Sequence, residues 1–192
     1  WSKHKKECKK LAAELKDEAL FTDPPPNIDC DICFRQLPIE LLGRKYQPCC
    51  GKMLCSGCIY AAFKADTRQL CPFCRTPEAT SEEEAVERVK KRVDCNDAVA
   101  IHQLGCFYYE GAGGLQQDYD KAMELYHQAG QLGCAVSHYN IADAYYHGDG
   151  LGRDTKKAIH YYELAAMGGN VYARHNLGRH IILQYCSLLS QW

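Results

Sequence analysis

Residues 118–133 read DYDKAMELYHQAGQLG, and residues 154–169 read DTKKAIHYYELAAMGG. Six identical residues stand at matching places, 36 positions apart: Asp118 and Asp154, Lys121 and Lys157, Ala122 and Ala158, Tyr126 and Tyr162, Ala129 and Ala165, Gly133 and Gly169. Apolar and small residues recur at helical spacing in both stretches. Helices repeated at such an interval are typical of an α-helical solenoid, in which each unit buries its apolar stripe against the next.

The repeat extends upstream of these stretches. Across the glycine turn the offset becomes 37, because the first unit has one extra residue in its loop; the matches are Leu104 with Ile141, Tyr108 with Tyr145, Tyr109 with Tyr146 and Gly111 with Gly148. In the first unit we expect helices at about 97–110 and 119–132. Asp118 is the predicted N-cap of the second helix, and Gly133 its C-terminal cap.

The repeat also continues downstream, where Asn176-Leu177-Gly178 begins a third unit that then loses the pattern. We therefore expect repeat one at 96–133, repeat two at 134–169 and a partial, diverged repeat at 170–192. The solenoid is predicted to hold about two and a half helix-turn-helix units.

This pattern resembles the Sel-one-like repeat, a relative of the tetratricopeptide repeat. The first unit matches the family pattern at Leu104-Gly105, Tyr108, Gly111, Gly114-Leu115, Asp118, Lys121-Ala122, Tyr126, Ala129 and Gly133. The resemblance covers about 96–180. It implies a concave surface that binds a protein substrate or adaptor and has no chemistry of its own.

Eight of the cysteines that precede the repeats form four pairs: Cys30 and Cys33, Cys49 and Cys50, Cys55 and Cys58, Cys71 and Cys74. Two intervening residues let both sulfurs of a Cys-x2-Cys pair reach one tetrahedral metal at about 2.3 Å. The eight thiolates are enough for two structural zinc ions. A disulfide framework is the weaker explanation, because the chain has an odd total of 13 cysteines and the pairs follow metal-ligand spacing.

The cysteine zone at 28–77 resembles a RING finger, a small α+β fold with a short hairpin, a helix and two crossed zinc ions. In that family, ligand pairs one and three bind the first zinc and pairs two and four the second. The resemblance implies Cys30, Cys33, Cys55 and Cys58 for zinc one. For zinc two it implies Cys49, Cys50, Cys71 and Cys74. The whole chain is thus predicted to be mainly α, a cross-brace finger followed by a solenoid.

One position departs from the RING pattern. In Cys50-Gly51-Lys52 a lysine stands at the usual histidine, and a protonated lysine does not bind zinc. Either Cys49 completes an all-cysteine second site, or one of Cys49 and Cys50 is a spectator. In the second case zinc two is incomplete or is completed by another residue.

The RING resemblance implies a ubiquitin ligase, which positions a charged ubiquitin-conjugating enzyme without a covalent intermediate of its own. Ile32 and Pro72 match positions that contact that enzyme, and Arg75 matches the cation that bridges enzyme and ubiquitin. The alternative is a non-catalytic zinc scaffold for protein–protein interaction. It is favoured by Lys52, and by the helix after Cys58, which has Ala62 or Phe63 where some active members have tryptophan.

The segments around the finger read differently. Residues 1–20 form a predicted basic helix, and Trp1, His4 and Cys8 resemble the end of a MYND zinc finger whose other ligands are missing. A proline-rich linker is expected at 21–27. Residues 78–95 are predicted to be a linker helix, opened by a capping box of Ser81 and Glu84 and running through about Val93.

Composition limits the partners. The net charge is −1 over 192 residues, so nucleic acid is unlikely; local contacts through lysines 3, 5, 6, 9 and 10 remain a minor hypothesis. No apolar run approaches the roughly 20 residues that span a bilayer, so we expect an intracellular protein, cytoplasmic or nuclear. The chain opens on Trp1 and its first methionine is Met53, which predicts further residues upstream.

Overall fold

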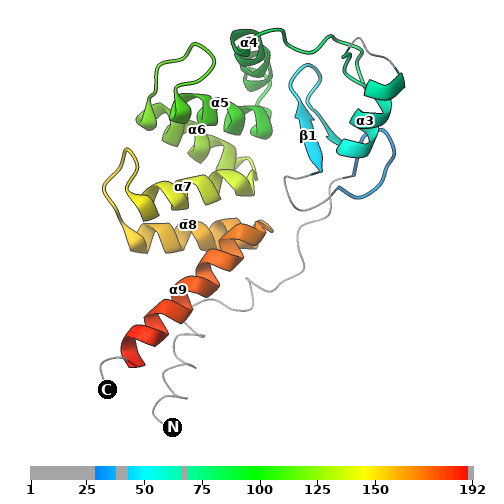
Figure 1. Cartoon of the computed structure of the whole chain (residues 1–192). Coiled ribbons are helices and arrows are strands. Elements are labelled where there is room, and N and C mark those ends of the chain that lie inside the picture. Colours follow the sequence, from blue (N-terminus) through cyan, green and yellow to red (C-terminus); the bar gives the residue numbers. More distant parts are fainter. Residues whose placement is uncertain (1–28, 38–42, 66–68, 190–192) are drawn as a thin grey trace.

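The computed structural model describes residues 29–37, 43–65 and 69–189, with side chains as far as residue 180. It has a small cysteine-rich module with one hairpin, followed by a stack of helices (Figure 1). The mainly α fold class is therefore confirmed. The predicted basic helix at 1–20, with its MYND-like tail, and the linker at 21–27 lie outside the described residues. No described helix combines the length and the apolar character needed to cross a bilayer.

Five helices form the stack: α5 (Ala98–Glu110), α6 (Tyr119–Gln131), α7 (Ala135–His147), α8 (Thr155–Met167) and α9 (Val171–Leu189). Figure 1 shows them following one another in layers. Asp118 and Asp154 cap α6 and α8 by accepting bonds from Lys121 N and Lys157 N. Gly133 follows α6 with a φ of 91°, a left-handed conformation that suits glycine.

The third unit differs from the simplest expectation. The repeat pattern is lost after Gly178, yet α9 continues without a break to Leu189. Loss of the repeat signature does not remove helix propensity, because the segment after it contains no proline and no further glycine.

Small residues at the repeat positions let the helices approach one another. Ala122, Ala129, Ala158 and Ala165 are fully buried, and Tyr126 and Tyr162 fill the space between neighbouring helices. Gly105 is one such contact, since a Cβ there would lie 2.7 Å from the Tyr126 ring. The repeated alanine and tyrosine positions thus build the solenoid core.

The cysteine-rich module has three regular elements. Strand β1 (Arg44–Gln47) pairs antiparallel with β2 (Lys52–Cys55), with Arg44 opposite Cys55, and helix α3 (Ser56–Ala65) follows directly. Helix α4 (Glu82–Val93) then connects the module to the stack. Ser81 caps α4 through Glu84 N, but the Glu84 carboxylate accepts from Thr80 N, so the capping box closes one residue early.

The module and the solenoid share one hydrophobic core. Tyr46 of β1 is buried together with Val86 and Val89 of α4 and with Ala100 and Leu104 of α5. Figure 1 shows the hairpin beside the α4–α5 end of the stack. The cysteine module therefore packs as the terminal layer of the solenoid.

Candidate metal centres

Two loops of the module have the same backbone conformation. After Cys30 and Cys33 the chain turns at Phe34 (φ 55°), and after Cys71 and Cys74 it turns at Arg75 (φ 62°). In each loop the N–H of the turn residue donates to the carbonyl of the first cysteine at 2.9 Å. Both cysteine side chains of each loop consequently lie on one side, as a bound metal requires.

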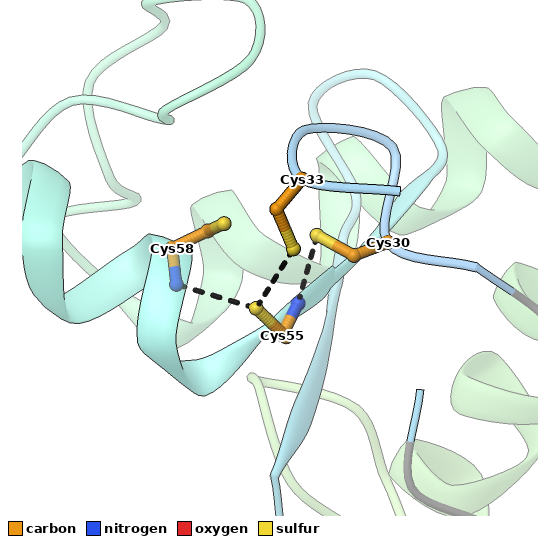
Figure 2. Close-up of side chains that lie close together, drawn as sticks. All are labelled: Cys30, Cys33, Cys55 and Cys58. Atoms are coloured by element: carbon orange, nitrogen blue, oxygen red, sulfur yellow. Dashed lines mark hydrogen bonds between the residues drawn. The ribbon is translucent and has the colours of Figure 1, made fainter. Parts of the chain in front are cut away.

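The first cluster is formed by Cys30, Cys33, Cys55 and Cys58, whose sulfurs all lie within 4.8 Å of one another. Figure 2 shows the four side chains gathered between the first turn, the end of β2 and the start of α3. The Cys33 and Cys55 sulfurs are 3.8 Å apart. Backbone N–H groups of Cys55 and Cys58 donate to the sulfurs of Cys30 and Cys55.

The second cluster is formed by Cys49, Cys50, Cys71 and Cys74, again within 4.8 Å. The sulfurs of Cys50 and Cys71 are 3.9 Å apart, and those of Cys49 and Cys74 are 3.4 Å apart. Both adjacent cysteines therefore point into the same cluster. This geometry favours the all-cysteine alternative over a spectator cysteine.

The spacing of the sulfurs suits a tetrahedral metal. Four sulfurs about 2.3 Å from a central zinc are roughly 3.8 Å from one another, close to the separations seen in both clusters. Disulfide bonds would need sulfurs about 2.05 Å apart, and all eight cysteines are free. Two cysteine groups able to bind metal ions are thus present.

Hydrogen bonds give one thiol of each cluster an acidic character. Burial raises the pKa of Cys30, but backbone N–H groups, Cys55 first, outweigh it and lower this pKa to about 6. Burial likewise opposes the bonds from Thr76 that lower the pKa of Cys74 to about 6. Burial raises the pKa of Cys50 to about 11 and that of Cys58 to about 12, so metal binding must displace protons there.

Lys52, at the position of the usual histidine, contacts both cysteine turns. Its Nζ donates to Asp31 Oδ1 at 2.9 Å, inside the first cysteine turn. The same ammonium lies 5.3 Å from the ring centroid of Phe73, inside the last turn. Lys52 therefore links the loops of the two clusters.

The three residues matched to ligase positions are all found in these turns. Ile32 is 37% exposed between Cys30 and Cys33, and Arg75 is exposed directly after Cys74. Pro72 is partly buried and lines a pocket of about 300 Å³ together with Ile59 and Phe63 of α3. Ile32 does not line that pocket. The positive φ of Arg75 follows from the turn, because Phe34 has it as well.

A polar network behind the second cluster was missed by sequence reasoning. Tyr46 donates to Asp97 Oδ2 at 2.6 Å, and the Arg92 guanidinium donates to the same oxygen at 2.9 Å. Asp97 Oδ1 meanwhile caps α5 through Val99 N and Ala100 N. A Cβ on Gly51 would lie 2.2 Å from Arg92, so the Cys50 loop also packs on this network. The one feature of the sequence that points to this network is Asp97 at the N-cap position of α5.

Comparison with known proteins identifies the solenoid. The Sel1 repeat family matches residues 98–134 and 135–170, so the two expected repeats are Sel1 repeats. The matched residues do not include the cysteine module, whose interpretation depends on its own geometry.

Two curated relatives match about half of this chain. The "ERAD-associated E3 ubiquitin-protein ligase component HRD3B" of Arabidopsis thaliana is 31% identical over 98 residues, which is 50% of this chain and 15% of the relative. The "Chitin synthase regulator SKT5" of Saccharomyces cerevisiae is 37% identical over 90 residues, 46% of this chain and 13% of the relative. The match thus spans a small part of each relative.

Solved structures give similar matches. A Sel1 repeat protein from Oxalobacter formigenes has a TM-score of 0.49 and 28% identity, covering 50% of this chain and 39% of the other. The protective antigen c5321 of uropathogenic Escherichia coli has a TM-score of 0.49 and 30% identity, covering 55% of this chain and 22% of the other.

Proposed function

We propose that this protein is a zinc-stabilised scaffold for protein–protein interaction, in which the cysteine module and the Sel1 repeats form one rigid body with two binding surfaces. The observation that carries the proposal is the shared core of Tyr46, Val86, Val89, Ala100 and Leu104. A module connected only by a flexible linker would not bury its side chains against the repeats. The curated Sel1 relatives are named as a ligase component and as a regulator, which agrees with such a role.

Zinc is the metal that suits both clusters. Four thiolates in a tetrahedral arrangement are the ligand set of structural zinc sites, and a four-thiolate site leaves no open position for a substrate. Zinc one would be held by Cys30, Cys33, Cys55 and Cys58, and zinc two by Cys49, Cys50, Cys71 and Cys74. Their contribution is to the fold, since a module this small buries little apolar surface of its own.

The rigid-body claim is tested by hydrogen exchange on the whole chain, with zinc and after chelation. We expect chelation to deprotect the hairpin and also the first turns of α4 and α5, because Tyr46 leaves the shared core. The α8 amides, which lie two layers away, serve as the internal control and stay protected. Full retention of α5 protection after zinc removal would contradict the claim.

Interaction is tested by co-purification with single-surface variants. Ile32→Ala removes an exposed apolar contact on the cysteine module, and Tyr172→Ala removes one on α9, where Tyr172 is 45% exposed. A scaffold predicts one set of proteins lost with each variant. If both variants retain every partner of the wild type, the two-surface scaffold is wrong.

A second candidate function is a RING-type ubiquitin ligase, in which the module recruits a conjugating enzyme and the repeats recruit a substrate or adaptor. The observation that favours it is the crossed ligand order, with pairs one and three in one cluster and pairs two and four in the other. Ile32 and Pro72 would contact the conjugating enzyme, and Arg75 would bridge it to ubiquitin through a planar set of donors.

The ligase is tested by reconstituted ubiquitination with a panel of conjugating enzymes. Ile32→Ala and Arg75→Ala should each abolish most activity while the zinc content stays unchanged. Arg35→Ala is the matched control, since Arg35 is an exposed arginine in the other cysteine turn. Inactivity of the zinc-loaded wild type across the panel would reject the ligase and leave the scaffold.

A further inference from the structure

The two Sel1 repeats have different side chains at one equivalent position, which is Cys106 in the first repeat and Asp143 in the second. In the first repeat, the Tyr126 hydroxyl and the Asn140 amide both approach the Cys106 sulfur, at 3.5 and 3.8 Å. In the second repeat, the hydroxyl of Tyr162, which corresponds to Tyr126, donates to Asp143 Oδ1 at 3.2 Å. Asp143 stands 37 positions after Cys106, in line with the offset of the first helices. A neutral thiol has thus been replaced by a carboxylate.

The first repeat shows that the same helix arrangement accommodates a thiol at this position. In the first repeat a thiol satisfies the same neighbours, and His102 joins them with Nε2 3.6 Å from Cys106 and Nδ1 3.0 Å from Ser137 Oγ. Asp143 remains accessible, with its side chain 41% exposed. Among the described residues, no hydrogen bond occupies Asp143 Oδ2. The second oxygen is therefore available to a ligand.

The carboxylate lies in a pocket lined with aromatic rings. The pocket has a volume of about 270 Å³ between α7, α8 and α9, and Tyr139, Tyr146 and Tyr162 line it beside Asp143. The Tyr139 and Tyr162 ring centroids are 5.7 Å apart, and those of Tyr146 and Tyr162 are 6.5 Å apart, with tilted planes. Small-molecule sites are usually about 300 Å³ or larger, so this pocket suits a single long side chain.

Tyrosine faces and a carboxylate together recognise a cation. The fold already uses this pairing elsewhere, with Lys121 4.5 Å above the Tyr108 ring and Lys157 5.0 Å above the Tyr145 ring. Residues 96–180 contain six Lys and Arg against nine Asp and Glu, a net charge of −3. The general field of the solenoid therefore favours a basic partner.

An imidazole and a guanidinium at the rim of the pocket further limit which partners fit. His147 Nε2 lies 3.7 Å from Asp143 Oδ1, and the exposed Arg179 lines the α9 side of the pocket. Arg179 disfavours a ligand that is basic throughout. The best fit is therefore one lysine or arginine between neutral or acidic neighbours.

We propose that this pocket binds a single lysine or arginine side chain of a protein partner, with its charged group at Asp143 and its methylenes against Tyr139, Tyr146 and Tyr162. The inference rests on the proposed scaffold function, since it specifies what a partner brings to the repeat surface. It assigns the second repeat a specificity that the first repeat lacks.

The test is an NMR titration of the zinc-loaded whole chain with acetylated pentapeptides Gly-Ser-X-Ser-Gly, where X is Lys, Arg, Met or Glu. The Lys and Arg peptides should shift the amide signals of α7 and α8 in a saturable manner, while the Met and Glu peptides should not. Asp143→Asn should weaken binding of the Lys and Arg peptides about fivefold or more, since it removes the charge but keeps the acceptor for Tyr162.

Two further variants complete the design. Asp143→Cys introduces the residue of the first repeat and should lose binding while keeping the fold. Asp120→Asn makes the same charge change at an exposed site outside the pocket and should bind like the wild type. Equal binding by Asp143→Asn and wild type, or no saturable shift with either cationic peptide, would overturn the proposal. A chain that fails in this way but stays zinc-loaded and keeps its partners would leave the scaffold function intact.

Discussion

The Tyr46 hydroxyl donates a 2.6 Å hydrogen bond to Asp97, the residue that caps the first helix of the Sel1 repeats. The Asp97 carboxylate thus both caps the first helix of the solenoid and accepts a hydrogen bond from the cysteine module. Burial, followed by the bond to Asp97, raises the pKa of Tyr46, so the hydroxyl remains a donor at all ordinary pH values. We therefore expect this contact to couple the stability of the cysteine module to that of the repeats.

Removing this hydroxyl should weaken both parts together. Tyr46→Phe keeps the ring in the shared core and deletes only the bond, so we expect a loss of about 1 to 2 kcal/mol in the free energy of unfolding. Denaturant unfolding of the zinc-loaded chain measures it. Tyr60→Phe is the control, because Tyr60 is 59% exposed on α3. An equal effect of the two variants would mean that the Tyr46–Asp97 bond contributes nothing.

The Asp97 carboxylate predicts a particular pH dependence. Burial opposes its ionisation, but the bonds from Tyr46 and Arg92 outweigh burial and lower its pKa. Its contribution is therefore fully present above the unfolded value of about 3.9 and is lost as the pH falls through the folded value.

The measurement is the difference in unfolding free energy between wild type and Asp97→Asn. Protonation of the cysteines affects both proteins, so most of it cancels in the difference. We expect a constant difference above about pH 5 that shrinks below about pH 4. A difference that grows on acidification would show that Asp97 is not the ionised partner.

Metal content should report on the adjacent cysteines. Wild type is expected to contain about two zinc ions per chain, and Cys50→Ser about one, because a three-thiolate site binds zinc more weakly. Cys95→Ser changes an exposed cysteine outside both clusters and should retain two. Metal analysis of the purified chains decides the matter, and two tightly bound ions in Cys50→Ser would make Cys50 a spectator.

Alanine substitutions at two glycines allow the stability cost of backbone strain to be measured apart from the cost of a packing clash. Gly113 (φ 64°) and Gly133 (φ 91°) both adopt left-handed conformations, but a Cβ at Gly113 would lie 2.3 Å from Val86 Cγ2, whereas nothing lies within 4 Å at Gly133. Gly133→Ala should cost about 1 kcal/mol of stability from strain alone. Gly113→Ala should cost about 1 to 3 kcal/mol more, as the loop is pushed off α4. If thermal unfolding shows a similar loss of stability for both variants, the loop at Gly113 moves away from Val86 at little cost.

Local patterns in the chain predicted most of the architecture. The 36-residue recurrence of Ala122 and Tyr126 anticipated the stacked helices, and Asp118 anticipated a helix start to the residue. The Cys-x2-Cys pairs anticipated two clusters, since two-residue spacing is a local geometric condition. The bond from Lys52 to Asp31, in contrast, joins residues 21 positions apart and has no local signature.

Helix periodicity, caps and thiolate spacing act over a few residues, so the helices, the repeat and the candidate sulfur ligands could be predicted from the chain. Tertiary structure alone decided that Tyr46 would meet Asp97, and that Asp143 would open into a tyrosine-lined pocket while Cys106 at the same repeat position would be satisfied internally. Those outcomes depend on which side chains other helices bring to one place. Such contacts form only when apolar surfaces far apart in the chain are buried together.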